Sequence, residues 1–335
     1  MSKVNQFGAF PSVRPRRLRQ ADWVRRLVRE TTLGADDLIW AIVAHDGAQP
    51  RVPVQAMPGI ERLNVEEAAK AAEEARALGI PLIALFPFID GAKKDNQGSE
   101  ATNPKGLVPA CVRAMKAAAP EVGVMVDIAL DPFTDHGHDG VLRGGAIVND
   151  ESVARLVDQA LLLAQAGADV IAPSDMMDGR VGAIRMALEK AGKQDTLIMS
   201  YAAKYASCFY GPYREAIGSA KALTGDKKTY QMDFANTDEA LKECALDVAE
   251  GADMLMVKPG LAYLDIVRRV KDAFSLPTFV FQVSGEYSMI KAAAAAGWLE
   301  EDRAIVETLT AFKRAGADGI ITYFAPRAAR LLAAA

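Results

Sequence analysis

Eight short apolar runs, each followed by an alanine-rich stretch with helical spacing, constrain the fold of this 335-residue chain more than any other feature. Unbroken runs of Ile, Val, Leu and Met are typical of parallel strands that are buried on both faces of a sheet. The runs cover residues 37–44, 80–87, 122–129, 168–174, 196–202, 252–259, 277–284 and 317–324. Three of them begin with the phrase Gly-Ala-Asp, in which the glycine ends a helix and the aspartate leads into the strand.

Eight strands that alternate with helices over residues 37–324 predict an α/β protein, a (β/α)8 TIM barrel. The alternative is a doubly wound sheet, but no Gly-x-Gly-x-x-Gly follows the first strand to support a dinucleotide site. Residues 1–36 lie outside the repeat, so we expect an N-terminal arm for subunit contacts there and the catalytic barrel at 37–335. Residues 203–236 form a long connection after the fifth strand, with the glycine, aromatic and cationic content of an active-site lid.

The charge balance gives no reason to expect nucleic acid or an anionic membrane as a partner, because 39 Lys and Arg face 43 Asp and Glu. The seven arginines of residues 14–30 favour an acidic neighbouring subunit over RNA, so we expect a homo-oligomer. No apolar run reaches the roughly 18 residues of a membrane-spanning helix, and the N-terminus lacks the apolar core of a signal peptide. We therefore expect a cytoplasmic protein. Cys111, Cys208 and Cys244 are far apart, which argues against disulfides and structural zinc.

Polar side chains stand where the predicted strands end, which is where barrel enzymes place their catalytic groups. These residues are Asp127 and Asp131, Ser174 and Asp175, Tyr201 and Lys204, Lys258, Ser284, and Tyr323. Lys258 directly follows an apolar run, so its side chain must start inside the barrel. Burial lowers the pKa of an amine, and an amine that forms an imine must be uncharged. A single strand-end lysine is more often a surface cation. However, Lys204 ends the neighbouring strand, and together the two lysines favour covalent carbonyl chemistry.

Several segments resemble the porphobilinogen synthase family, also called 5-aminolevulinate dehydratase. They are MVKPG at 256–260, SYAAKYASCFYGPYR at 200–214, APSDMMDGR at 172–180, KKTYQMD at 227–233 and DPFTDHGHDG at 131–140. The likeness extends from about residue 10 to residue 330. It implies that the protein condenses two molecules of 5-aminolevulinate into porphobilinogen, an early step of tetrapyrrole synthesis.

The resemblance assigns a role to each matching position. Lys258 forms the Schiff base with the substrate that supplies the propionate side of the product (the P side), and Lys204 does so for the acetate side (the A side). The A-side carboxylate is expected to meet Arg214, Lys227 and Gln231, and the P-side carboxylate Ser284 and Tyr323. Ser174 and Asp127 hold the P-side amine or relay protons, and Tyr201 covers the reacting atoms. A strand-end hydroxyl or carboxylate can equally cap the next helix, and this is our interpretation of Asp175 and Asp178.

Metal use is left open by the same resemblance. Zinc-dependent members carry three cysteines where this chain has Ala129, Asp131 and Asp139. Carboxylates suit magnesium and not zinc, and Ala129 offers no donor, so a magnesium site would rest on two aspartates; an arginine or lysine could instead neutralise them without metal. We expect His136 and His138, two positions apart, to point to opposite sides if the segment is extended, and therefore not to form a two-histidine site.

We therefore expect activity that does not require zinc and that either uses magnesium or needs no metal. A second, allosteric magnesium known in some relatives would lie near Glu250, although a helix-end glutamate is more often plain surface. Octamers and hexamers both occur in the family.

Two other functions compete with this prediction. A class I aldolase-like lyase also uses a lysine at a strand end, but typically one, and its phosphate substrates call for a glycine-rich loop that residues 285–297 do not form. A non-catalytic metabolite-binding barrel would have no use for two buried amines, which are unfavourable without a chemical role.

Overall fold

The computed structural model of the protein describes residues 8–218, 223 and 225–334. The chain divides into two compact units, residues 1–32 and 33–335. In the first unit, a 3-10 helix (Pro15–Arg19) and helix α1 (Asp22–Leu27) bury none of their residues. Trp23 and Leu27 of α1 are largely exposed.

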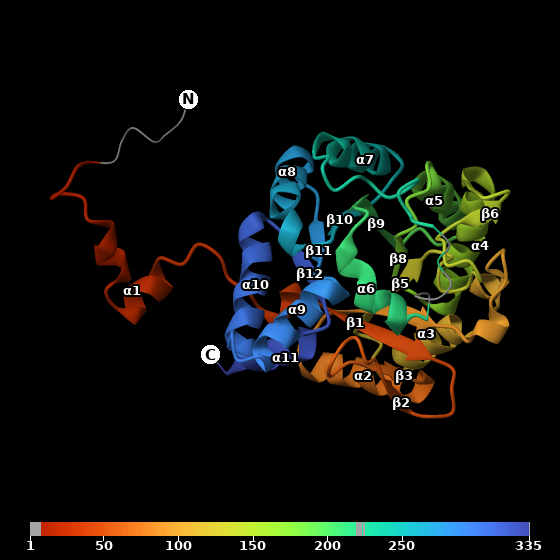
Figure 1. Ribbon diagram of the computed structural model, residues 1–335, viewed down its shortest axis with the longest axis horizontal. Helices are drawn as coiled ribbons and strands as arrows, with labels where there is room; N and C mark the ends of the chain where they lie inside the picture. The colour runs from red at the N-terminus through yellow and green to blue at the C-terminus, as the bar shows by residue number, and fades with distance from the viewer. Residues whose placement is uncertain (1–7, 219–222, 224, 335) are drawn as a thin grey trace. The chain divides into compact units, whose positions relative to one another are not determined.

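The second unit contains the closed barrel of eight parallel strands that the sequence predicts (Figure 1). Each strand pairs with the next, and β12 pairs with β1 to close the ring. The strands are β1 (Leu38–His45), β4 (Leu82–Phe88), β5 (Gly123–Ile128), β8 (Val170–Pro173), β9 (Leu197–Lys204), β10 (Met254–Lys258), β11 (Thr278–Phe281) and β12 (Gly319–Thr322). Nearly all of their residues are buried, because helices cover the outside of the ring and side chains fill the inside.

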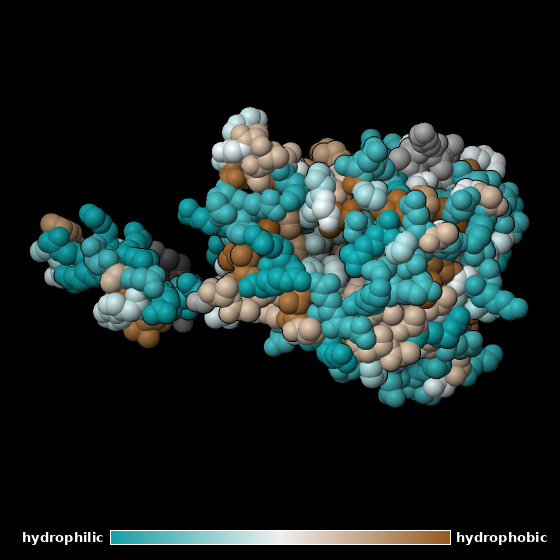
Figure 2. Space-filling model, turned by 90° about the horizontal axis from the view of Figure 1, so that it is seen from below, coloured by the Kyte–Doolittle hydropathy of each residue, from teal (hydrophilic) through white to brown (hydrophobic). Residues whose placement is uncertain are grey.

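Helices follow the strands along the chain (Figure 1). They are α2 (Val65–Ala77), α3 (Leu107–Ala118), α4 (Asn149–Ala166), α5 (Arg180–Lys190), α6 (Gly211–Ala216), α7 (Asp238–Ala249), α8 (Leu264–Phe274), α9 (Ser284–Ala295), α10 (Glu301–Ala315) and α11 (Ala325–Ala333). None of the described helices is long and apolar enough to cross a membrane. On the face of the second unit seen in Figure 2, apolar side chains form small groups among hydrophilic ones.

The Gly-Ala-Asp motifs have a clear structural role. Gly167 and Gly316 adopt positive φ and end α4 and α10, a conformation that glycine reaches without strain. The aspartate that follows bonds to the neighbouring strand: the Asp169 carboxylate accepts the N–H of Val124 (2.8 Å), and the Asp318 carboxylate accepts that of Thr278 (2.7 Å). The motif therefore links the beginnings of adjacent strands through a hydrogen bond.

Two antiparallel hairpins were not predicted. One pairs β2 (Arg51–Pro53) with β3 (Glu61–Leu63), and β3 also pairs with β1. The other joins β6 (Val141–Arg143) to β7 (Ala146–Val148). The strand predicted at residues 277–284 ends earlier than expected, because β11 stops at Phe281 and Ser284 begins α9.

Candidate active site

A bulge in β9 brings the two predicted lysines together. Lys258 of β10 is the register partner of Lys204 of β9. Earlier in the two strands, Leu255 pairs with Ser200 and Val257 pairs with Ala203, so β9 contains one residue more than β10 over this stretch. Residues three apart in a regular strand point to opposite faces. The extra residue in β9 therefore allows both Tyr201 and Lys204 to reach the site.

Lys258 lies among aromatic rings and is only 5% exposed. Its Nζ is 4.5 Å from the ring centroid of Phe281 and 5.0 Å from that of Tyr201. The rings of Tyr213 and Tyr210 follow at 5.2 and 5.5 Å. Burial, followed by the positive charge of Lys204, lowers the pKa of Lys258 to about 7, although nearby carboxylates oppose the shift. A large share of the Lys258 amine is therefore uncharged at neutral pH.

Lys204 has a different, polar environment. Its Nζ donates to Asp139 Oδ1 (3.3 Å) and to the carbonyl oxygen of Ser174. Lys204 is 5% exposed, so this pair is buried. The site thus holds two lysines of unlike character: one beside a carboxylate and one surrounded by rings.

Several buried polar atoms at the strand ends have no hydrogen-bond partner within the described residues. They include Asp127 Oδ1 and the hydroxyls of Tyr201 and Tyr323. Burial raises the pKa of Asp127 to about 6, against the opposing charge of Lys258. A buried polar atom without a hydrogen bond costs about 1–3 kcal/mol. Such atoms are therefore suited to bind a polar ligand, as the resemblance implies for all three residues.

The other predicted binding residues lie in, or contact, the long connection after β9 at residues 203–236. Arg214, Lys227 and Gln231 line one cavity of about 680 Å³. Ser284 contacts the same segment, because its Oγ accepts the N–H of Tyr213 (2.8 Å). The structure thus brings together the residues predicted for the A-side carboxylate.

The two aspartates that replace cysteines are paired with a lysine. Lys227 Nζ lies 3.0 Å from Asp131 Oδ2 and 2.7 Å from Asp139 Oδ2, and all three side chains are at most 10% exposed. Burial would raise the pKa of Asp139, but the ammonium groups of Lys204 and Lys227 outweigh burial and hold it well below its usual range. In turn, the aspartates outweigh burial at Lys227 and raise its pKa.

These residues do not fit a magnesium ion. Two carboxylates already share an ammonium group, and Ala129 offers no side-chain donor. Across the described ranges, no three His, Cys, Asp or Glu side chains are grouped so that they could hold a metal. The reasoning for the histidines was wrong on two points. Residues two apart in an extended segment point to the same side, and residues 131–140 are not extended; the rings of His136 and His138 lie 5.6 Å apart.

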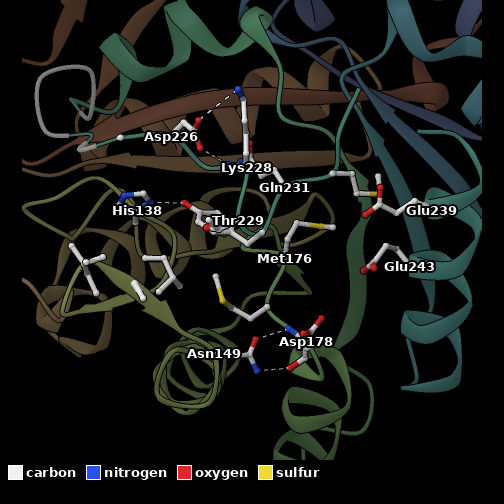
Figure 3. Close-up of a pocket in the computed structure, with 18 residues that line it drawn as sticks. His138, Asn149, Met176, Asp178, Asp226, Lys228, Thr229, Gln231, Glu239 and Glu243 are labelled. Atoms are coloured by element: carbon white, nitrogen blue, oxygen red, sulfur yellow. Dashed lines mark hydrogen bonds and ion pairs between the residues drawn. The ribbon is translucent and has the colours of Figure 1, made fainter. Parts of the chain in front are cut away.

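Tyr230 contacts this cluster and also lines a second cavity of about 630 Å³. Figure 3 shows that cavity. The Tyr230 hydroxyl donates to Asp139 Oδ2 (2.9 Å) and lies 3.0 Å from His138 Nδ1. His138 lines the second cavity, and the side chains of Glu239 and Glu243 from α7 face it (Figure 3). Sequence reasoning did not identify Tyr230, although it lies in the KKTYQMD segment.

The capping interpretation of Asp175 and Asp178 was wrong. The N-cap residue of α5 is Gly179, and no side chain of its own caps this helix. Asp175 is instead fully buried, where its Oδ1 accepts the N–H of Met177 (2.7 Å). Burial raises the pKa of Asp175 to about 6, and Arg180 opposes this shift. Asp178 donates its N–H to Asn149 Oδ1 (2.8 Å).

A carboxylate from another helix binds the first turn of α5. Glu250, the position predicted for a second magnesium, ends α7 and accepts the N–H of Gly182 (3.0 Å). Next to it lies a buried network that the sequence did not reveal: Arg180 Nη1 donates to Asp247 Oδ1 (2.6 Å), and Ser200 Oγ donates to Asp247 Oδ2 (2.5 Å).

The chain resembles known proteins over almost its whole length. Residues 12–331 match the family model described as delta-aminolevulinic acid dehydratase. The delta-aminolevulinic acid dehydratase of Bradyrhizobium diazoefficiens is 63% identical over 321 residues, which cover 96% of this chain and 91% of that protein. The delta-aminolevulinic acid dehydratase of Rhodobacter capsulatus is 53% identical over 325 residues, with 97% and 98% covered.

A solved structure agrees with these matches. The delta-aminolevulinic acid dehydratase (porphobilinogen synthase) of Toxoplasma gondii ME49, in complex with the reaction product porphobilinogen, matches with a TM-score of 0.93 at 48% identity. The match covers 95% of this chain and 91% of that one. These similarities and the lysine pair argue against the two competing functions, an aldolase-like lyase and a non-catalytic metabolite-binding barrel. The chain belongs to the delta-aminolevulinic acid dehydratase family, whose members are porphobilinogen synthases.

Proposed function

We propose that this protein condenses two molecules of 5-aminolevulinate into porphobilinogen through Schiff bases on Lys258 and Lys204. The observation that carries the proposal is the facing pair of buried lysines at the ends of β9 and β10. In each Schiff base, the amine adds to the substrate's keto carbon and water leaves. The resulting iminium withdraws electrons, so that a carbon next to it can lose a proton and attack the other substrate.

We assign Lys258 to the P-side substrate and Lys204 to the A-side substrate. The uncharged amine of Lys258 is a competent nucleophile near neutral pH, and the partnerless hydroxyl of Tyr323 and carboxylate of Asp127 are available to that substrate. Ser284 is proposed to join Tyr323 on the P-side carboxylate, and Ser174 to act with Asp127 on the P-side amine. Tyr201, whose ring lies beside Lys258, covers the reacting atoms.

Arg214 is the principal cation that we assign to the A-side carboxylate, with Gln231 as a hydrogen-bond donor. Lys227 is already paired with two aspartates, whereas no ion pair of Arg214 is found in the described part of the chain. Lys227 is therefore proposed to contact the carboxylate while it remains in the aspartate cluster.

Trapping the covalent intermediate tests this mechanism. Incubation with 5-aminolevulinate and borohydride should attach substrate to Lys258, as peptide mapping would show. Lys258→Met and Lys204→Met should each lose nearly all turnover, because each iminium activates a different half of the reaction. Lys105→Met is the matched control, since Lys105 is exposed. Label found only on other residues would refute the mechanism.

We also propose that Asp131 and Asp139 work without a metal, with Lys227 as their counter-ion. Activity should therefore survive exhaustive chelation, and zinc should not raise it. Stoichiometric bound zinc or magnesium whose removal abolishes turnover would contradict this proposal. Magnesium stimulation that Asp131→Asn leaves intact and Glu250→Gln abolishes would place the ion at the second predicted position, near Glu250.

The oligomer and the compartment are part of the proposal. The 3-10 helix Pro15–Arg19 and helix α1 contain no buried residues, which suits a subunit contact, and light scattering would distinguish an octamer from a hexamer. We propose the cytoplasm as the compartment, because all three cysteines are free, as a reducing environment would keep them.

A further inference from the structure

We propose that Arg62 is a positioning residue for substrate binding, because it holds the C-terminal end of the helix that carries Tyr213 and Arg214. This inference rests on the proposed function and names a residue that touches neither lysine. Arg62 lies on β3, in one of the hairpins added to the barrel. It is remote in sequence from α6, which it contacts.

The contacts of Arg62 match the needs of a helix end. Its Nε donates to the carbonyl oxygen of Ala216 (2.7 Å), and its Nη2 donates to that of Glu215 (2.7 Å). Carbonyl groups in the last turn of a helix have no donor from a following turn, and they carry partial negative charge. A planar guanidinium with two parallel donors satisfies two of them at once, which an ammonium group does not.

Other contacts fix the same point in space. The Arg62 guanidinium carbon lies 4.1 Å from the ring centroid of Phe88, at the end of β4. Ala56, in the loop between β2 and β3, donates its N–H to Glu215 Oε1 (3.2 Å). Gly218 has a positive φ and passes so close to Phe88 that a Cβ would lie 2.7 Å from the ring. The end of α6 is thus held between the hairpin and the barrel.

The middle of α6 is anchored inside the site. Tyr213 donates its N–H to Ser284 Oγ, and its ring lies 5.2 Å from Lys258 Nζ. Arg214 follows and lines the cavity shared with Lys227 and Gln231. Because α6 has only six residues, loss of its C-terminal contacts would loosen both side chains. Arg62 therefore affects the placement of the proposed carboxylate-binding cation without lining that cavity.

Arg51→Ala is a matched control for Arg62→Ala. Arg51 lies on the other strand of the same hairpin, and its ion pairs are with Glu61 and Glu67, not with α6. Hydrogen exchange over residues 211–218 measures the order of α6 directly and requires no turnover. Steady-state kinetics with 5-aminolevulinate then separates substrate binding from chemistry.

We expect Arg62→Ala to speed exchange over 211–218 and to raise KM about tenfold, the equivalent of one charge-assisted hydrogen bond, with a smaller change in kcat. Arg62→Lys keeps the charge but not the two parallel donors, so it should fall between wild type and Arg62→Ala. It also decides the question if Arg62→Ala fails to fold. Arg51→Ala should match wild type in both measurements.

Unchanged exchange over 211–218 in the folded Arg62 variants would overturn the inference, as would faster exchange with an unchanged KM. An equal rise of KM in Arg51→Ala would also overturn it, because the effect would then belong to the hairpin and not to Arg62. If the wild-type protein forms no porphobilinogen, the proposed function fails, and the exchange measurement still reports whether Arg62 holds α6.

Discussion

The lowered pKa of Lys258 predicts how its reactivity depends on pH, and mutations of its neighbours should shift that pH dependence both upwards and downwards. An ordinary lysine, with a pKa of about 10.4, is uncharged in roughly one molecule in 2,500 at pH 7. With its pKa lowered to about 7, Lys258 is uncharged in half of the molecules at that pH. The environment therefore increases the supply of nucleophile about a thousandfold. Labelling of Lys258 should rise with pH through a midpoint near 7.

The neighbours of Lys258 should move this midpoint in opposite directions. Lys204 contributes a like charge, so Lys204→Met should raise the midpoint. Lys204 and Lys258 are register partners on neighbouring strands, so the like charge of Lys204 disfavours the ammonium form of Lys258 and is, after burial, the second cause of its lowered pKa. Asp127 contributes an opposite charge, so Asp127→Asn should lower the midpoint.

The assay is the initial rate of borohydride-trapped labelling of the Lys258 peptide, measured from about pH 5 to pH 10. It does not need turnover, so the inactive Lys204→Met variant can be compared with wild type. The midpoint of the labelling rate against pH reports the pKa of Lys258. The amplitude of that curve also depends on how the substrate binds, so only the midpoints are compared. Asp195→Asn, at an exposed position before β9, is the control for loss of one negative charge. Midpoints that move in the same direction in both site variants would refute the electrostatic explanation.

Three further predictions concern binding and stability. Arg214→Ala should raise KM by one to two decades, because a hydrogen bond to a charged group contributes about 1.5–3 kcal/mol, and steady-state kinetics would show this. Arg180→Met should lower the free energy of unfolding by about 3–5 kcal/mol in urea titrations, since it leaves the buried Asp247 without its counter-ion, whereas Arg143→Ala, which breaks an exposed pair, should change it by about 1 kcal/mol or less. Gly285→Ala should destabilise the protein by about 1–3 kcal/mol in the same titrations, because its Cβ would overlap the carbonyl oxygen of Phe209 in the lid.

The barrel could be predicted from the sequence because each strand is a local signal. An apolar run such as residues 252–259 can be buried on both faces only inside a sheet covered by helices. The hairpin of β2 and β3 carries no such signal, since both strands have three residues and expose polar side chains. Its Arg62, which contacts α6 154 positions away, was therefore missed.

The lysine pair could be predicted for the same reason, but its surroundings could not. Lys204 and Lys258 each end an apolar run, so their place at one end of the barrel follows from the strand pattern. The rings around Lys258 come from β9, β11 and the connection after β9, and no spacing in the sequence links Tyr213 with Phe281. Capping of α5 was mispredicted because the carboxylate that binds its first turn, Glu250, comes from α7.

Charge compensation in the aspartate cluster links the proposed active site to the long connection after β9. Lys227 belongs to the long connection after β9 and lies 96 positions from Asp131, so neither residue alone reveals the pair. A metal ion held by cysteines would neutralise its ligands whatever the conformation of that connection. Here Asp139, which also pairs with Lys204, keeps its second counter-ion only while the segment that carries Lys227 is in place. The charges around Lys204 therefore depend on the same segment that carries Arg214 and Gln231, the residues that we propose for the A-side carboxylate.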